Sequence, residues 1–283
     1  MIDTSLLRVF KAVADTGSVS AAAEQLHYVQ PNVSARLAGL ERELDTRLFY
    51  RRSRGMELTP EGRRLLPHAE EVLGRLEHIS RGFTGDDFAG ELRIGTTDTF
   101  ASLHIASVAK ALHDRYPRLD LSITTDESHE LIESLLHYRL DAAFVEIEVT
   151  AAGLVAQTVR EDELVLVSAP DRGDRPLSND DHLIAFPPGC SYRAALERSF
   201  AGAGTEPGAV QEFRGVDAVL GCTAAGLGVT ALPRAIAENS RWPVAISELP
   251  TELRSTRTYW VYRREAGEIP SIARVTELVT GGV

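Results

Sequence analysis

The chain has 283 residues, of which 30 are basic and 41 acidic, and its formal net charge is −11. A hydrophobic fraction of 43% and a charged fraction of 25% are ordinary for a globular protein, and the length allows two or three domains with sizeable cores. No apolar run approaches about 18 residues and no signal-peptide pattern is present, which excludes a membrane span and leads us to expect a cytoplasmic protein with reduced cysteines.

The acidic charge is concentrated outside the N-terminal part. Residues 1–84 hold 12 basic and 11 acidic residues, a net charge of +1, so the other 199 residues hold 18 basic and 30 acidic residues, a net charge of −12. Salt screens charges that lie more than roughly 8 Å from a bound phosphate. The overall acidity therefore does not exclude DNA binding by the N-terminal part.

The first two expected helices are short. The first runs over about Thr4–Ala14 with one apolar face, and Gly17 ends it. Ser18 is a favoured N-cap for the second helix, whose side chains are small enough for another helix to cross closely: Ala21, Ala22, Ala23 and Leu26. This order is typical of the start of a helix-turn-helix.

The third helix is expected to contact DNA. Pro31 suits its first turn, where an N–H would have no intrahelical partner. Its apolar residues recur at steps of four, at Val33, Leu37, Leu40 and Leu44. The polar face offers side chains that bond base edges or hold phosphates. With the preceding cap, the predicted contacts in this region are Ser18, Gln30, Pro31, Asn32, Ser34 and Arg36. The alternative is a solvated amphipathic helix.

A basic hairpin follows the third helix. Arg51, Arg52 and Arg54 precede Gly55, a residue suited to a hairpin tip, and the chain then returns to a helix start at Thr59–Pro60. Basic side chains beside a DNA-reading helix can clamp phosphates. We therefore predict a winged helix-turn-helix domain over residues 1–59, with these three arginines among its DNA contacts.

The segment resembles the DNA-binding domain of the LysR-type transcriptional regulators. It matches their pattern AAxxLH, QPxxS, LExxL, LFxR, R and LTxxG over about sixty residues. The matching residues are Ala22, Ala23, Leu26, His27, Gln30, Pro31, Ser34, Leu40, Glu41, Leu44, Leu48, Phe49, Arg51, Arg54, Leu58, Thr59 and Gly62. The resemblance implies a transcription factor that binds double-stranded promoter DNA as a dimer or a dimer of dimers. One departure is Val29, which stands where many members have a capping serine.

A long helix is expected next, over residues 60–82. Four apolar residues at steps of three, four and three form the seam of a short coiled coil: Leu66, Ala69, Leu73 and Leu76. The resemblance implies that two chains pair through this helix, and the alternative is a single helix packed on its own core. The stretch FTGDDFAG at 83–90 is expected to be a hinge.

From residue 91 the pattern alternates between strands and helices, which predicts an α/β domain of two lobes. Lobe 1 takes about 91–165 and 257–283, and lobe 2 about 166–256. The expected strands are 92–95, 119–124, 142–145, 183–186, 210–213, 229–232 and 258–262, and the expected helices are 102–116, 129–138, 192–200, 216–225 and 271–280. The arrangement is similar to the effector-binding domain of the LysR family and to periplasmic binding proteins.

A ligand in such a fold lies at the carboxyl ends of parallel strands, beside helix N-termini. This rule predicts a small-molecule effector of unknown identity bound by Thr97, Thr99, Phe100, Thr125, Ser128, Gly189, Cys190, Ser191 and Thr223. The resemblance places effector-binding hydroxyls at Thr99 and Ser128, and the alternative is that both are plain helix caps. Arg193 and Arg214 are either partners of an anionic ligand or surface ion-pair residues.

Cys190 suggests a second possibility. At a helix N-terminus near Arg193 its thiol pKa could be lowered, which favours oxidation, and some LysR-type proteins are peroxide sensors with a cysteine in this lobe. The alternative is a small buried hydrophobic residue. The sequence does not decide whether Cys190 pairs with Cys222.

Other classes of function find little support. The eight histidines show no HExxH spacing, GxSxG is absent, and the glycine-rich AAGLGVT at 224–230 leads into a strand where a dinucleotide loop would follow one. A solute-binding protein for transport would fit the lobes but not the first 84 residues. We therefore expect no catalytic residues, no metal and no cofactor.

Overall fold

The computed structural model describes residues 2–52, 55–82 and 90–281. The backbone contacts divide the chain into two compact units, an N-terminal unit of residues 1–85 with 136–139 and a C-terminal unit of residues 86–135 with 140–283. The expected hinge at 83–90 lies outside the described residues except for Gly90. No described helix is both long enough and apolar enough to cross a membrane.

The N-terminal unit begins with three helices, α1 (Thr4–Thr16), α2 (Val19–Gln25) and α3 (Gln30–Glu43). Asp3 caps α1 by accepting a hydrogen bond from the Ser5 N–H at 2.8 Å, and Gly17 ends α1 with a φ of 61°. The predicted first helix is thus confirmed, and it continues two residues beyond Ala14. The apolar faces of the three helices share one core, in which Phe10, Val33 and Leu40 are fully buried.

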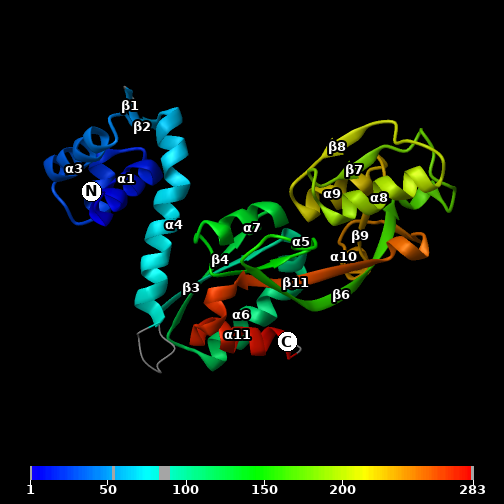
Figure 1. Cartoon of the computed structure of the whole chain (residues 1–283). Helices are drawn as coiled ribbons and strands as arrows, with labels where there is room; N and C mark the ends of the chain where they lie inside the picture. The colour runs from blue at the N-terminus through cyan, green and yellow to red at the C-terminus, as the bar shows by residue number, and fades with distance from the viewer. Residues whose placement is uncertain (1, 53–54, 83–89, 282–283) are drawn as a thin grey trace. The chain divides into compact units, whose positions relative to one another are not determined.

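A hairpin and a long helix complete this unit. Strands β1 (Phe49–Arg52) and β2 (Gly55–Leu58) pair antiparallel, as predicted, and the Met56 N–H donates to the Gly17 carbonyl at 2.8 Å. A Cβ on Gly55, whose φ is 132°, would collide with that same carbonyl, so the hairpin needs glycine there. Helix α4 (Pro60–Gly82) follows, and Figure 1 shows α1 and the hairpin packed beside it.

The first lobe of the C-terminal unit contains the predicted parallel strands. Strands β3 (Gly90–Thr96), β4 (Leu119–Thr125) and β5 (Ala142–Val145) are parallel, with β3 in the middle. Strand β11 (Ser255–Arg263) returns to pair antiparallel with β5. The helices are α5 (Asp98–Phe100), the π-helical turn Ala101–Ile105, α6 (Ala106–Arg115), α7 (Ser128–Leu136) and α11 (Pro270–Thr280). The helix expected at 102–116 therefore starts earlier and is interrupted by a π turn.

The second lobe is smaller. Strands β7 (Leu183–Ala185) and β8 (Val210–Glu212) are parallel, and β9 (Thr230–Pro233) and β10 (Ala245–Glu248) complete its strands. Helices α8 (Ser191–Gly202), α9 (Val216–Ala224) and α10 (Arg234–Glu238) pack on them. The core of this lobe centres on Tyr192, Leu196 and Phe200 of α8, all about 1% exposed.

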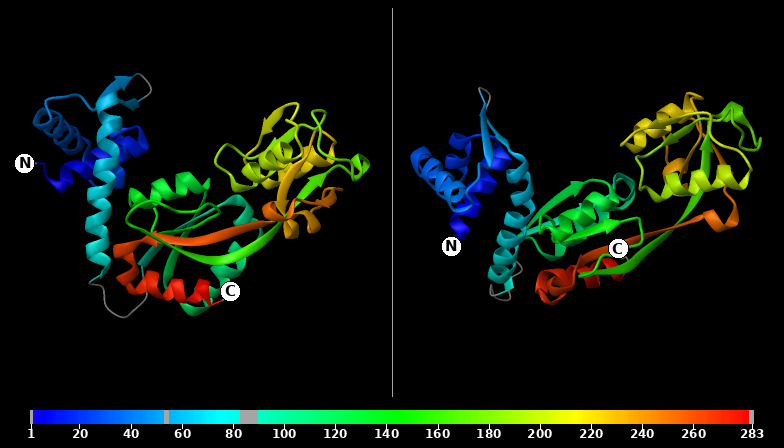
Figure 2. Two further views of the ribbon diagram at one scale, coloured as in Figure 1. Left: turned by 45° about the vertical axis from the view of Figure 1, so that its right-hand side comes forward. Right: turned by 45° about the horizontal axis from the view of Figure 1, so that its top comes forward.

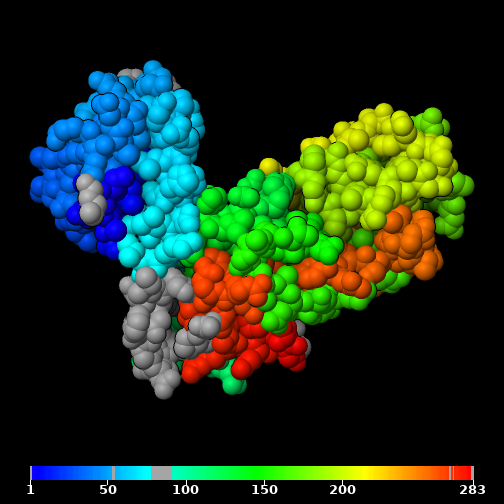
Figure 3. All heavy atoms as spheres, viewed as in Figure 1, coloured from blue at the N-terminus to red at the C-terminus, as the bar shows by residue number. Residues whose placement is uncertain are grey.

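Strand β6 (Leu154–Ser168) joins the two lobes and was not predicted. Its first part pairs with β11, and its end pairs with β9 through Leu164–Val167 and with β10 through Val165–Ser168. Both β6 and β11 run from one lobe to the other in every ribbon view (Figures 1 and 2). The space-filling view shows the lobes in contact beside these strands (Figure 3). The two lobes therefore share one continuous sheet.

Candidate functional site

The polar residues predicted to contact DNA lie at the start of α3 and just before α2. Ser18 caps α2 by accepting a hydrogen bond from the Ala21 N–H at 3.4 Å. Gln30 and Pro31 are exposed, whereas Asn32 and Ser34 are half-buried. Val29 occupies the N-cap position of α3 without a side-chain hydrogen bond and is 68% exposed. Sequence reasoning did not count this exposed apolar side chain as a DNA contact.

Arg36 is held within the N-terminal unit. Its Nε donates to Asn32 Oδ1 at 3.0 Å, and one Nη donates to Ser5 Oγ at 2.5 Å. The guanidinium also lies over the ring of Tyr28, 5.4 Å from the ring centroid. These contacts fix the side chain on one face of α3, and a base contact would require at least some of them to be exchanged.

The hairpin carries exposed positive charge. Arg51 is exposed, and Arg52 pairs with Glu57 at 3.3 Å while its guanidinium lies over the ring of Tyr50. Arg54 lies outside the described residues. An exposed ion pair of this kind is weak, so Arg52 can exchange Glu57 for a phosphate at small cost.

Part of the predicted coiled-coil seam on α4 packs inside the chain's own core and not on its surface. Ala69 and Leu73 are buried in the core of the N-terminal unit, and Leu66 packs against that core. Leu76 is half-buried. Val72, which the seam did not include, is 42% exposed on the same helix. A partner chain would therefore meet Val72 more directly than Ala69 or Leu73.

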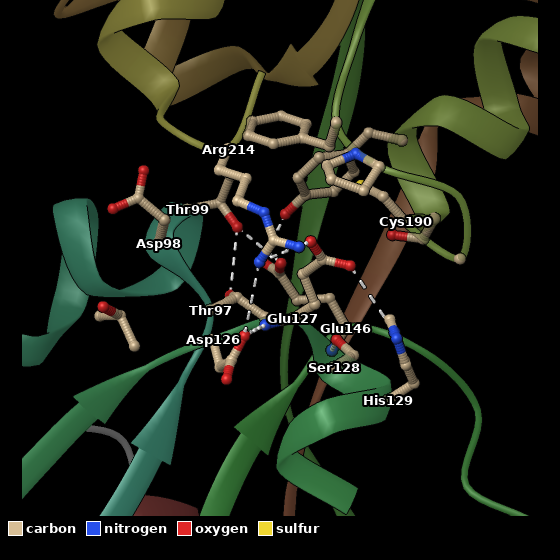
Figure 4. Close-up of a pocket in the computed structure, with 16 residues that line it drawn as sticks. Thr97, Asp98, Thr99, Asp126, Glu127, Ser128, His129, Glu146, Cys190 and Arg214 are labelled. Carbon is tan, nitrogen blue, oxygen red and sulfur yellow. Dashed lines mark hydrogen bonds and ion pairs between the residues drawn. The ribbon is translucent and has the colours of Figure 1, made fainter. Parts of the chain in front are cut away.

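A cavity of about 190 Å³ lies between the two lobes (Figure 4). It is lined by Thr97, Asp98, Thr99, Thr125, Asp126, Glu127, Ser128, His129, Glu146, Phe186, Pro187, Gly189, Cys190, Ser191, Tyr192 and Arg214. Seven of the nine predicted effector residues are in this lining, because the carboxyl ends of β3, β4 and β7 meet the starts of α5, α7 and α8 here. Their binding role remains a prediction.

The two other predicted residues do not line the cavity, and their placement is corrected. Phe100 is buried in the core of the first lobe, where its ring stacks on Phe144 with centroids 4.3 Å apart. Thr223 is fully buried, and its hydroxyl donates to the Val219 carbonyl within α9 at 2.8 Å. In both cases burial of the side chain in a core outweighs closeness in sequence to the site.

A buried carboxylate that sequence reasoning missed stands at the centre of the site. Glu146 directly follows β5 and is 9% exposed. The hydroxyl of Thr99 donates to its Oε2 at 2.6 Å, and the hydroxyl of Tyr192 donates to its Oε1. Burial raises the pKa of Glu146, and the hydroxyls of Thr99, Tyr192 and Thr97 oppose that shift. The signal in the sequence was an acidic residue immediately after the buried strand Ala142–Val145.

The hydroxyls of Thr99 and Ser128 both bond with Glu146. Thr97, not Thr99, caps α5 by accepting a hydrogen bond from the Phe100 N–H at 3.3 Å. Ser128 Oγ accepts a hydrogen bond from the Glu146 N–H at 3.0 Å. Both hydroxyls therefore hold Glu146 in place.

Three contacts around the cavity connect the lobes. Besides the bond from Tyr192 to Glu146, the N–H of Val216 at the start of α9 donates to Asp98 Oδ2 at 2.9 Å. Arg214 pairs with Glu127 at 3.3 Å and reaches Asp126 at 4.0 Å. Figure 4 shows this arginine extending from the second lobe toward both carboxylates. Any change in the cavity therefore acts on groups of both lobes.

The prediction of a lowered thiol pKa at Cys190 is wrong. Burial raises the pKa of Cys190 to about 11. Arg193 forms ion pairs with Glu197 at 2.8 Å and with Glu212 at 2.6 Å. Both Cys190 and Cys222 are free thiols. A buried protonated thiol reacts slowly with peroxide, so these features do not favour redox sensing.

Two family models match the chain. One, described as "LysR substrate binding domain", matches residues 85–282, and the other, "Bacterial regulatory helix-turn-helix protein, lysR family", matches residues 4–63. The HTH-type transcriptional regulator YofA of Bacillus velezensis is 36% identical over 262 residues, 92% of this chain and 91% of the relative. The HTH-type transcriptional regulator SoxR of an Arthrobacter species is also 36% identical, over 92% of this chain and 90% of the relative.

Solved structures show the same fold. Full-length CbnR in complex with its target DNA superposes with a TM-score of 0.70 at 24% identity, covering 100% of both chains. A full-length OxyR variant from Pseudomonas aeruginosa gives a TM-score of 0.73 at 20% identity, covering 99% of this chain and 94% of that one. The likeness extends over both units of the chain.

Proposed function

The chain belongs to the LysR family of transcriptional regulators, and from that premise we propose that it controls a promoter in response to a small molecule bound in the cavity between its lobes. DNA binding belongs to the winged helix-turn-helix and effector binding to the two-lobed domain. We include a cytoplasmic location in this proposal, because the promoter DNA of a bacterium lies in the cytoplasm. We also include the absence of catalysis, because control of a promoter needs no catalytic step by the regulator.

The observation that carries the proposal is the set of contacts across the cavity. Tyr192 and Glu146, Val216 and Asp98, and Arg214 and Glu127 join the lobes around it. A ligand in this cavity touches both lobes and competes with or adds to these contacts. It therefore binds one arrangement of the lobes more tightly than another, which is the requirement for shifting their populations.

The DNA-binding half of the proposal uses two chains. The start of α3 presents Gln30 to the major groove, and Arg51 and Arg52 of the hairpin contact the backbone phosphates. A single helix α3 contacts few bases. We therefore propose a homodimer, or a dimer of dimers, that pairs through α4 and presents two α3 helices, the readers, to successive half-sites. The effector then acts on DNA binding by changing the spacing of the readers.

A gel-shift experiment tests both halves. The DNA is the region upstream of the protein's own gene and of its neighbours, and the salt concentration is varied. Specific binding is expected to weaken steeply with salt, because arginines release counterions from the phosphates. A thermal-shift screen then identifies ligands, and Ser128→Trp, which fills the cavity, is expected to abolish their effect on the gel shift. Ligands that act equally on this variant would contradict the assignment of the cavity.

A further inference from the structure

The lining of the cavity is more negative than positive. Its basic residues are Arg214 and His129, and its acidic residues are Asp98, Asp126, Glu127 and Glu146. Four carboxylates therefore face one arginine and one histidine, and this balance of side chains favours a positively charged ligand.

The carboxylate of Glu146 is bonded by neutral hydroxyls. Among the residues that the structure describes, no basic side chain forms an ion pair with it, and the bonds to its carboxylate come from the neutral hydroxyls of Thr99 and Tyr192. A buried carboxylate without a counter-ion is costly, and burial raises the pKa of Glu146 accordingly. A cation placed beside it would remove this cost.

The hydroxyl groups of Thr97, Thr99 and Tyr192 have no donor left for an anion. Each hydroxyl has one proton to donate. Thr99 and Tyr192 give theirs to Glu146, and Thr97 lies 3.1 Å from the Thr99 oxygen, to which it donates when Thr99 bonds Glu146. These oxygens therefore present lone pairs to a ligand. Ser191 Oγ is buried in the lining without a partner, so it can accept a hydrogen bond or donate one.

The protein's own arginine already occupies part of the site. The guanidinium of Arg214 lies 3.3 Å from Glu127 and 4.0 Å from Asp126, although the side chain is 76% exposed. Figure 4 shows its nitrogens directed at both carboxylates. The geometry at the mouth of the cavity thus suits a positive group that carries several N–H donors.

On the premise that this cavity holds the effector, we propose that the effector is a small organic cation, a primary amine or a guanidine, whose positive group is neutralised by Glu146 and Glu127. The cavity of about 190 Å³ suits a small ligand. Phe186 and Pro187 in the lining offer an apolar wall for the rest of the molecule. The ligand's N–H groups donate to the carboxylates and to the free oxygen of Ser191.

Calorimetric titration of the full chain with three probes tests the charge preference. Benzylamine, benzyl alcohol and benzoate share a ring and differ in charge. Benzylamine is expected to bind at least about tenfold more tightly than benzoate, and Glu146→Gln is expected to weaken it by about tenfold, which corresponds to about 1.4 kcal/mol. The affinity for benzyl alcohol should change little. Glu148→Gln removes the same charge from an exposed position outside the lining and should leave all three affinities unchanged.

The opposite results would overturn the inference. They are tighter binding of benzoate, equal effects of Glu146→Gln and Glu148→Gln, or no binding of benzylamine at millimolar concentration. Circular dichroism checks that the variants fold, and Glu127→Gln replaces Glu146→Gln if that variant does not. If benzylamine binds without changing the gel shift, the proposed regulation fails and the charge preference stands. If an anion changes the gel shift through the cavity, the regulation stands and the charge preference fails.

Discussion

Replacing Thr99 by valine tests the role of the hydroxyl that holds Glu146. Thr99 is 4% exposed, and its hydroxyl donates to Glu146 Oε2 at 2.6 Å. Valine keeps the size of the side chain and removes the donor. A hydrogen bond to a charged group is worth about 1.5–3 kcal/mol. We expect Thr99→Val to lower the free energy of unfolding of the C-terminal unit by about 2 kcal/mol.

Urea unfolding followed by tryptophan fluorescence measures this loss, because the chain has two tryptophans and both, Trp242 and Trp260, belong to the C-terminal unit. Thr223→Val is the matched control. Thr223 is equally buried, but its hydroxyl donates to a carbonyl within α9 that the helix already uses. This control should lose less than about 1 kcal/mol.

A double-mutant cycle with Glu146→Gln separates the bond from the effect of size. If the hydroxyl stabilises the carboxylate, Thr99→Val should cost less in the Glu146→Gln chain, with a coupling energy of at least about 0.5 kcal/mol. Equal losses for Thr99→Val and Thr223→Val, together with no coupling to Glu146, would refute the reasoning.

Three further predictions concern DNA, pH and the thiol. Arg36→Ala is expected to cost about 1–3 kcal/mol of specific affinity in gel shifts, whereas Arg51→Ala should weaken all sequences about equally and lower the salt slope by about one. Because burial raises the pKa of Glu146 above its ordinary 4.5, the folded chain keeps this proton to a higher pH than the unfolded chain does. Stability of the C-terminal unit against urea should therefore fall as pH rises from 4.5 through the raised pKa, and Glu146→Gln should flatten that fall. Since the pKa of Cys190 is about 11, iodoacetamide at pH 8 should label it more slowly than free cysteine, and fast labelling in the folded state would contradict this environment.

Local signals explain which elements the sequence predicted well. The helix α3 follows from the spacing of Val33, Leu37 and Leu40, and the hairpin from Gly55 between basic and apolar runs. Strand β5 is a short apolar run, and strands β3 and β4 alternate apolar with polar or small residues. Each of these signals lies within the element itself, so no knowledge of distant partners is needed.

Elements that depend on distant partners were missed. The middle of β6 reads Arg160, Glu161, Asp162 and Glu163, and such a charged run is not typical of a strand. It is a strand because β11, about a hundred residues later in the chain, supplies its hydrogen bonds. Pairing with a distant strand, and not local propensity, therefore determines the secondary structure of these residues.

The chemistry of the cavity also depends on residues that are far apart in the sequence, so the sequence did not predict it. Glu146 bonds with Thr99, which is 47 residues away, and with Tyr192, which is 46 residues away. The environment of Cys190 was misjudged because a helix N-terminus and a nearby arginine were visible in the sequence, whereas burial was not. Desolvation is a property of the folded chain and reversed the expected shift.

The shared strand β6 has a consequence for how the C-terminal unit melts. Its first part is bonded to β11 in the first lobe, and residues Leu164–Val167 are bonded to β9 in the second. Unfolding of either lobe would break part of the hydrogen bonding of β6, and the other lobe depends on the same strand. We therefore expect the two lobes to unfold as one cooperative transition in calorimetry, with equal van't Hoff and calorimetric enthalpies for this unit, although each lobe has a core of its own.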